Sequence, residues 1–349
     1  MGYSIKKPRP FRGAIVGFGN MAEKGHLPGW RTLKGASITA VCDPRAERRS
    51  LAEKLLPGVR TYASWEDLYN SETLDFVDVC TPPPFHAAAI LAALNQNLNV
   101  LCEKPLVGTR AEYRKVRTLA LRKNRVVYPV HNWKHAPVLE RALQWIGQGL
   151  LGQVTYSEFH TLRTQPASGL TAWRGQKDDA GGGGILLDHG WHGIYLLLGF
   201  HGERPQEVSA WTEPRPGGSR TEHTAHLQIH FSHGVASLFL TWNAPRRHNS
   251  ARIYGEKGLV LIEDDRIELK TAEGRFKGAR FSSPLSEGSH HPNWTAGLLA
   301  DFLEALENPS SARRALEEAF WCLEISLLAY TSARSRGRRM KIPVPGRSE

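Results

Sequence analysis

At 349 residues the chain is longer than one ordinary hydrophobic core, which predicts two domains. Hydrophobic residues make up 41% and charged residues 23%, and the lack of a long apolar run argues against a membrane-spanning protein. Nine units of the net charge of +11 lie in residues 1–12 and 331–349, so the body of the chain lacks the continuous basic surface that nucleic acids require.

The N-terminus is basic, with Lys6, Lys7 and Arg9, but Arg12 and Gly13 interrupt the apolar segment that a signal peptide needs. The four cysteines are widely spaced and lie mostly in strand-like apolar runs, and no Cys-x-x-Cys motif occurs. Both observations predict reduced, buried thiols and a cytoplasmic location.

The first 130 residues alternate short apolar runs with longer stretches of helical spacing. The strand-like runs are Phe11 to Gly17, Ser37 to Asp43, Asp75 to Cys80, Asn99 to Cys102 and Arg125 to Val130. Helical spacing is clearest in Pro84 to Gln96 and Arg110 to Lys123. This alternation is typical of a doubly wound parallel α/β sheet. We therefore expect a nucleotide-binding domain over residues 1–130 and a second domain over 131–349.

A dinucleotide-binding fingerprint, Gly17-Phe18-Gly19-Asn20-Met21-Ala22, follows the first strand. Gly17 permits a tight turn, Gly19 lets the backbone approach a pyrophosphate, and Ala22 allows the helix to pack closely on the strand. Asp43 ends the second strand, 21 residues beyond Ala22, where a carboxylate binds the adenosine ribose. The alternative is a plain glycine turn and an N-cap aspartate.

A carboxylate at this position favours NAD, because it repels the 2′-phosphate of NADP. Arg45, Arg48 and Arg49 follow closely and can accommodate that phosphate, so NADP is the alternative cofactor. Two further motifs, Thr81-Pro82-Pro83-Pro84-Phe85-His86 and Glu103-Lys104-Pro105, follow strands at the edge where open α/β sheets bind ligands. For Lys104 a salt-bridged surface position is the alternative. The expected cofactor-binding residues are Gly17, Gly19, Asn20, Met21, Ala22, Asp43, Arg45, Thr81, Pro82, His86, Glu103 and Lys104.

Far downstream, the segment from Gly183 to His192 brings a carboxylate and an imidazole together where a helix is expected to begin. Asp188 and His192 are four residues apart and project from one helix face if Asp188 lies in the first turn. This pairing points to catalysis. The alternative is a helix N-cap at Asp188 and a packed His192.

The second half predicts a sheet whose strands are divided by glycine, proline or charged turns. The predicted strands are Val154 to Thr164, Gln206 to Thr212, His223 to Phe231, Val235 to Trp242, Ala251 to Tyr254, Leu259 to Ile262 and Arg266 to Leu269. In one of them His226 and His230 share a polar face that is solvated or lies at an interface, and with no third ligand nearby we expect no metal site. Helical spacing returns at Trp294 to Glu307 and Leu316 to Tyr330.

Five motifs occur in an order and spacing that resemble the glucose-fructose oxidoreductase and inositol dehydrogenase family, Gfo/Idh/MocA. They are the fingerprint, the Thr-Pro-Pro-x-x-His turn, Glu-Lys-Pro, Trp173-Arg174 ahead of the glycines at 181–184, and Asp188-x-Gly190-x-His192. The resemblance implies an N-terminal Rossmann domain and a C-terminal α+β domain. In this family the large, mostly antiparallel sheet of the second domain is open on one face and is commonly buried in a homodimer or homotetramer.

The resemblance also implies hydride transfer between NAD(P) and a hydroxyl-bearing carbon of a sugar, cyclitol or nucleotide sugar. His192 is then the expected base, Asp188 orients the imidazole or binds a neighbouring hydroxyl, and Lys104 stabilises the developing alkoxide. Proton transfer by Lys104 is the alternative division of roles. A redox-neutral, NAD-dependent glycosidase and a non-catalytic, NAD-binding regulator are the alternative functions.

Substrate contacts are expected from a second group of polar and aromatic side chains. They are Lys104, His131, Asn132, Trp133, Trp173, Arg174, Asp188 and His192. The chain departs from the family pattern at His131-Asn132-Trp133-Lys134, where Arg or Lys often precedes the -x-x-Pro, and at Tyr195, where Asp is common.

Overall fold

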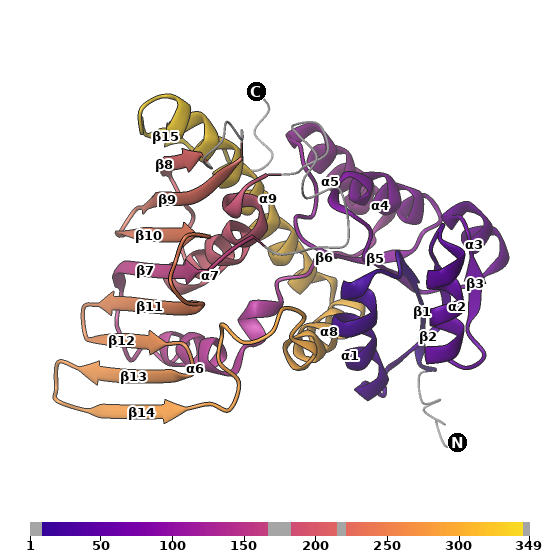
Figure 1. Ribbon diagram of the computed structural model, residues 1–349, viewed down its shortest axis with the longest axis horizontal. Coiled ribbons are helices and arrows are strands. Elements are labelled where there is room, and N and C mark those ends of the chain that lie inside the picture. The colour runs from indigo at the N-terminus through magenta and orange to yellow at the C-terminus, as the bar shows by residue number, and fades with distance from the viewer. Residues whose placement is uncertain (1–8, 167–182, 215–220, 345–349) are drawn as a thin grey trace, which may run out of the picture. The chain divides into compact units, whose positions relative to one another are not determined.

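The computed structural model describes residues 9–166, 183–214 and 221–344 (Figure 1). Its contacts divide the chain into two compact units. Unit 1 comprises residues 1–107, 111–130 and 290–316, and unit 2 comprises 108–110, 131–289 and 317–349. Among the described residues, no helix is both long enough and apolar enough to cross a membrane.

Unit 1 contains a six-stranded parallel sheet in the order β3-β2-β1-β4-β5-β6 (Figure 1). The strands are β1 (Phe11–Val16), β2 (Ala36–Cys42), β3 (Arg60–Tyr62), β4 (Phe76–Val79), β5 (Asn99–Cys102) and β6 (Val127–Pro129). The strand order reverses between β1 and β4, and the carboxyl ends on either side of this switch point are where such sheets bind ligands. The predicted doubly wound sheet is confirmed; β3 was not predicted because it is three residues long and not apolar.

The helices of this part of the chain connect the parallel strands, as the sequence pattern predicts. They are the π-helix η1 (Ala22–His26), α1 (Leu27–Thr32), α2 (Ala46–Leu55), α3 (Trp65–Ser71), the 3-10 helix η2 (Pro83–Phe85), α4 (His86–Asn95) and α5 (Arg110–Lys123). A distant segment, α8 (Pro292–Glu307), packs on α1. Its Phe302 meets Phe76 of β4 edge to face at 5.4 Å, and Phe76 stacks on Trp30 at 5.0 Å. The core of unit 1 therefore includes a helix from near the C-terminus.

Unit 2 contains a nine-stranded sheet in the order β14-β13-β12-β11-β7-β10-β9-β8-β15. Its strands are β7 (Val154–Leu162), β8 (Glu207–Pro214), β9 (Glu222–Phe231), β10 (Gly234–Thr241), β11 (His248–Gly255), β12 (Gly258–Glu263), β13 (Arg266–Thr271), β14 (Phe276–Arg280) and β15 (Met340–Lys341). Only β7 and β10 pair in parallel, so the predicted mostly antiparallel sheet is confirmed. The short edge strands β14 and β15 were not predicted.

One face of this sheet is buried against helices. Besides α7 (Trp191–His201), unit 2 contains the 3-10 helix η3 (Asn132–His135), α6 (Pro137–Gly147), the π-helix η5 (Leu186–Gly190) and most of α9 (Pro309–Arg334). Helix α7 lies on β7 and β10 (Figure 1), and Gly193 allows this approach because an added Cβ would lie 2.4 Å from Leu238. On β9, Leu227 and Ile229 are buried while Gln228 between them is exposed, so the predicted alternation is confirmed.

Candidate functional site

The fingerprint forms a turn that only glycine tolerates at its first position. Gly17 has a φ of 91°, and an added Cβ would lie 2.8 Å from the Thr81 backbone nitrogen. At Gly19, by contrast, no atom lies within 4 Å of such a Cβ, so the space above the backbone is open. Asn20 and Met21 lead into η1, where Ala22 is fully buried. This geometry fits a backbone that a pyrophosphate approaches.

Asp43 ties the fingerprint turn to the end of β2. Its carboxylate is 2% exposed and accepts the Phe18 backbone N–H at 2.8 Å. Arg45 donates to the same carboxylate through Nε at 3.0 Å and Nη2 at 3.1 Å. The N-cap position of α2 is Arg45 rather than Asp43, so the alternative of an N-cap aspartate is wrong. A charged guanidinium therefore stands directly beside the acid expected to bind ribose.

His86 joins two loops at the carboxyl edge of the sheet. Its Nδ1 lies 2.7 Å from the Pro105 carbonyl oxygen, and its Nε2 lies 2.8 Å from that of Thr81. Burial lowers the pKa of His86, and the two backbone carbonyls offset part of this shift. The Thr81 hydroxyl is buried and has no hydrogen-bond partner among the described residues. An orphaned hydroxyl beside Gly17 marks a place where a bound group can supply the missing partner.

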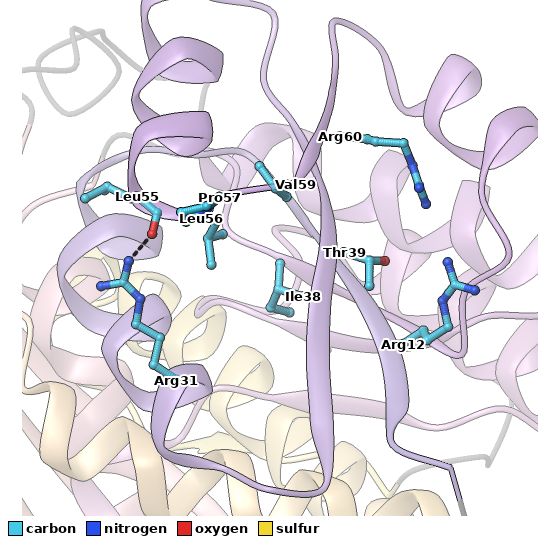
Figure 2. A pocket seen from close by; sticks show the side chains of 10 residues that line it. Arg12, Arg31, Ile38, Thr39, Leu55, Leu56, Pro57, Val59 and Arg60 are labelled. Carbon is cyan, nitrogen blue, oxygen red and sulfur yellow. Dashed lines mark hydrogen bonds between the residues drawn. The ribbon is translucent and has the colours of Figure 1, made fainter.

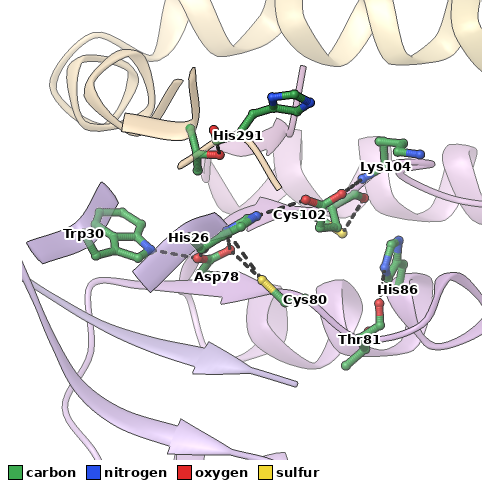
Figure 3. A network of polar contacts seen from close by, with 11 residues as sticks. His26, Trp30, Asp78, Cys80, Thr81, His86, Cys102, Lys104 and His291 are labelled. Carbon is green, nitrogen blue, oxygen red and sulfur yellow. Dashed lines mark hydrogen bonds and ion pairs between the residues drawn. The ribbon is translucent and has the colours of Figure 1, made fainter. Parts of the chain in front are cut away.

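Glu103 and Lys104 follow β5 at the same edge of the sheet. The Glu103 carboxylate is 8% exposed; Oε2 accepts the Lys104 backbone N–H at 2.9 Å, and Oε1 lies 3.0 Å from His26 Nε2. His26 in turn contacts Asp78 (Figure 3). Sequence reasoning missed His26 and Asp78, although an acid inside the apolar strand Phe76–Val79 is a signal that could have found them.

In unit 2, the backbone at Gly184, four residues before Asp188, lies close against the start of β9. An added Cβ at Gly184 would lie 2.0 Å from the Glu222 carbonyl oxygen. The Glu222 side chain accepts the Leu186 backbone N–H at 3.0 Å and the Tyr330 hydroxyl at 2.9 Å. These contacts anchor the start of η5, and they explain why glycine stands at position 184.

Asp188 lies inside the first turn of η5, and the N-cap of that helix is Ile185. The alternative that Asp188 is the N-cap is therefore wrong, and its placement meets the condition for projecting from the same face as His192. The Asp188 side chain is 15% exposed, and its carboxylate lies 3.6 Å from His189 Nε2. It is thus partly accessible at the start of the helix.

His192 is 8% exposed and is held by two aromatic residues of the same unit. Its Nδ1 lies 2.8 Å from the Tyr195 hydroxyl oxygen, and its ring stacks on Trp133 at 4.9 Å with an interplanar angle of 18°. The Tyr195 hydroxyl also accepts the Trp133 backbone N–H at 3.0 Å. The departure from the family pattern at Tyr195 thus supplies a partner for His192.

His131 packs against Tyr195, the residue that contacts His192. Trp191 Nε1 donates to His131 Nε2 at 3.0 Å, and His131 Nδ1 lies 2.6 Å from Glu318. Because an indole nitrogen only donates, Nδ1 carries the His131 proton toward Glu318. The His131 ring stacks on Tyr195 at 4.2 Å.

Glu318 also binds Lys134 at 2.6 Å. Burial alone would raise the pKa of Glu318, but the charge of Lys134 and the hydrogen bond from His131 lower it to about 2. Next to these residues, Asn132 Oδ1 is buried without a hydrogen-bond partner among the described residues. Unit 2 therefore brings together His131, Asn132, Trp133 and His192, whereas Trp173 and Arg174 lie outside the described residues.

A surface pocket of about 520 Å³ lies elsewhere on unit 1 (Figure 2). Ile38 and Thr39 of β2, the end of α2 and Arg60 of β3 line it. It contains none of the predicted cofactor-binding residues. It therefore does not belong to the candidate site.

The parallel sheet with its glycine turn and terminal acid defines a dinucleotide-binding Rossmann domain, here followed by an α+β domain with a large sheet. The chain belongs to the Gfo/Idh/MocA oxidoreductase family. Residues 11–131 match the family model described as "Oxidoreductase family, NAD-binding Rossmann fold", and residues 139–261 match the "GFO/IDH/MocA C-terminal domain". The expected family is thus confirmed.

Similar curated proteins include D-apiose dehydrogenase of Paraburkholderia graminis, with 32% identity over 45% of this chain and 43% of that protein. D-glucoside 3-dehydrogenase of Escherichia coli is 30% identical over 55% of each chain. The alignments thus span about half the length of these relatives. Among solved structures, levoglucosan dehydrogenase in complex with NADH superposes with a TM-score of 0.82 at 21% identity, covering 96% of this chain and 100% of that chain. This likeness shows the fold.

Proposed function

We propose that the protein is an NAD(P)-dependent oxidoreductase that transfers a hydride between the nicotinamide and a hydroxyl-bearing carbon of a sugar, cyclitol or nucleotide sugar. One observation carries the proposal: Gly17, Asp43 and Lys104 follow the carboxyl ends of β1, β2 and β5 in one parallel sheet. Relatives named D-apiose dehydrogenase and D-glucoside 3-dehydrogenase support a sugar as substrate.

The residues of unit 1 fit a dinucleotide. The open space at Gly19 suits the pyrophosphate, Asp43 suits the ribose hydroxyls, and the orphaned Thr81 hydroxyl offers a further contact. When bound, the nicotinamide supplies the carbon that accepts or returns the hydride. NAD is the preferred cofactor in this proposal, and Arg45 provides a contact for the additional phosphate of NADP.

In the proposed mechanism His192 removes the hydroxyl proton through Nε2, while its Nδ1 stays hydrogen-bonded to Tyr195. Lys104 binds the reacting oxygen and stabilises its developing negative charge. Asp188 and Asn132 bind neighbouring hydroxyl groups of the substrate. The stacked Trp133 holds the His192 ring and thereby directs Nε2.

The proposal includes a homodimer or homotetramer formed through the face of the nine-stranded sheet opposite α7. Strand register places Tyr156, Trp211 and Tyr254 on the same face, with Trp211 54% exposed and the two tyrosines 36% and 38% exposed. Large exposed aromatic side chains on one sheet face favour association. A cytoplasmic location is also proposed, which the four free, buried cysteines favour.

The test is absorbance at 340 nm with purified protein, NAD or NADP, and a panel of pentoses, hexoses, inositols and UDP-sugars. We expect NADH or NADPH to form with one substrate class, and turnover to disappear in Lys104→Ala but not in Lys115→Ala, an exposed lysine of α5. Turnover that survives in Lys104→Ala would contradict the role of Lys104. Cofactor binding with no absorbance change for any panel member would instead favour an untested substrate, the redox-neutral glycosidase or the non-catalytic binding protein.

A further inference from the structure

Unit 1 encloses a polar network that the proposed reaction does not use (Figure 3). It consists of Trp30, Asp78, His26 and Glu103, and we refer to these four residues as the His26 network. His26 and Asp78 have no exposed surface, and Trp30 is 4% exposed. Such a cluster inside an apolar core is costly unless its charges and hydrogen bonds are matched.

Both ring nitrogens of His26 face carboxylate oxygens. Nδ1 lies 2.8 Å from Asp78 Oδ2, and Nε2 lies 3.0 Å from Glu103 Oε1. A neutral imidazole carries one N–H and can donate to only one of these acceptors, whereas an imidazolium donates to both. The geometry therefore matches a charged ring whose two N–H groups each face a carboxyl oxygen.

The remaining partners agree with this protonation state. Trp30 Nε1 donates to Asp78 Oδ2 at 2.7 Å, and the Lys104 backbone N–H donates to Glu103 Oε2 at 2.9 Å, so each acid accepts a further N–H. Burial alone would lower the pKa of His26, but the neighbouring groups, Asp78 foremost, together raise it well above 6.5. Burial likewise raises the pKa of Glu103, but the hydrogen bond and charge of His26, together with Lys104, outweigh burial and lower the pKa.

We propose that His26 is a buried imidazolium that joins the fingerprint helix to the Glu103–Lys104 peptide and acts as a positioning residue for Lys104. His26 is the last residue of η1, which begins at Ala22 of the fingerprint. Through Glu103 it fixes the backbone amide from which the Lys104 side chain departs. The role toward Lys104 rests on the proposed function, whereas the charged state of His26 does not.

The charged and titratable groups around His26 come from several elements. Asp78 and Cys80 belong to β4 and its end, and Cys102, Glu103 and Lys104 belong to β5 and the residues that follow it. Burial raises the pKa of both cysteine thiols, which keeps them neutral at ordinary pH. His291, the N-cap residue of α8, lies above His26 in the view of Figure 3.

A metal ion is the competing explanation, because ligand atoms of His26, Asp78 and Cys80 lie within 4.8 Å of one another. A tetrahedral zinc ion with bonds of about 2.0 Å would hold nitrogen and oxygen ligands about 3.3 Å apart. The separation of 2.8 Å between His26 Nδ1 and Asp78 Oδ2 is instead that of a hydrogen bond. A protonated Cys80 thiol also makes a poor ligand.

The charge is tested by nitrogen NMR of the full-length protein labelled with ¹⁵N at its histidine rings, with the His26 signals assigned by their loss in His26→Gln. We expect two slowly exchanging ring N–H groups with imidazolium shifts that persist to about pH 8. His201 is the internal control, since burial lowers its pKa to about 4 and it should appear neutral. A neutral His26 ring, or one equivalent of bound zinc in the purified protein, would overturn the proposal.

The positioning role is tested by replacing His26 with two amide side chains of different length, Gln and Asn. In His26→Gln the longer side chain reaches toward Glu103, whereas in His26→Asn it can reach only Asp78. We expect kcat, corrected for folded fraction, to fall about tenfold more in His26→Asn than in His26→Gln, because losing the Glu103 contact frees the Lys104 peptide.

His201→Gln is the matched control for loss of a buried histidine, since His201 hydrogen-bonds Ser157 in unit 2. It should lower the melting temperature and leave kcat unchanged. Equal kcat losses in both His26 variants would overturn the positioning role. Failure of the proposed function would appear differently, as an absence of turnover in the unsubstituted protein, with the NMR result still readable.

Discussion

The hydroxyl oxygen of Tyr195 lies 2.8 Å from Nδ1 of His192 and also accepts the Trp133 backbone N–H at 3.0 Å. The partner of Nδ1 in the proposed base is therefore the hydroxyl group of a phenol. A neutral acceptor can hold the imidazole in one orientation, but it stabilises the imidazolium less than an anion does. His131, stacked on Tyr195 at 4.2 Å, keeps the phenol in place.

Replacing Tyr195 by Phe should lower kcat by about 10- to 100-fold, because the His192 ring loses the contact that directs Nε2. The buried Trp133 amide also loses its acceptor, which should cost about 1–3 kcal/mol of unfolding free energy. Steady-state kinetics and urea unfolding measure the two effects. Tyr69→Phe is the control, because the Tyr69 hydroxyl has no hydrogen-bond partner among the described residues. An undiminished kcat in Tyr195→Phe would exclude this role.

Glu318 should make the stability of the protein sensitive to acid. Its folded pKa of about 2 lies below the ordinary 4.5, so its contribution is present above pH 4.5 and is lost as the pH falls from 4.5 toward 2. Glu318→Gln should weaken this pH dependence while lowering stability at neutral pH, because Lys134 then loses its buried counter-charge. Melting temperature measured against pH is the readout, and parallel curves for the two proteins would contradict the prediction.

Arg45 should govern the use of NADP. In Arg45→Ala we expect the dissociation constant of NADPH to rise about tenfold and that of NADH to change about twofold or less, because the proposed contact of the guanidinium is with the 2′-phosphate that only NADPH carries. The change in NADPH or NADH fluorescence on binding measures both dissociation constants without a substrate. Arg114→Ala, an exposed position of α5, is the control. Equal losses for both cofactors would show that Arg45 acts only by holding Asp43.

Trp211→Glu should dissociate the proposed oligomer. The side chain is 54% exposed in the single chain, so a charge there should cost little folding stability yet disrupt an apolar contact between copies. Sedimentation velocity over a range of concentrations gives the mass. Leu121→Glu, at an apolar position on α5 of unit 1 that is 49% exposed, should leave the mass unchanged. A monomeric parent protein would refute the proposed assembly outright.

Much of the fold follows from local pattern. Asn99 to Cys102 and Arg110 to Lys123 were predicted with the observed bounds, because each is a continuous run with one clear periodicity. The strands β3, β14 and β15 escaped prediction because they are short or polar and are stabilised by their neighbours in the sheet. The division into domains at residue 130 stays a prediction, as do the assigned roles of the site residues.

The sequence by itself determined the glycine turn, the acid at the end of β2 and the helical spacing of Asp188 and His192, since backbone freedom and side-chain periodicity are local properties. Only the tertiary structure decided that Phe302 of α8 packs on Phe76 of the parallel sheet. It likewise decided that His26 meets Glu103, 77 positions away in the chain. Such contacts depend on which buried groups find matching partners across the fold, and no pattern within a single segment encodes that choice.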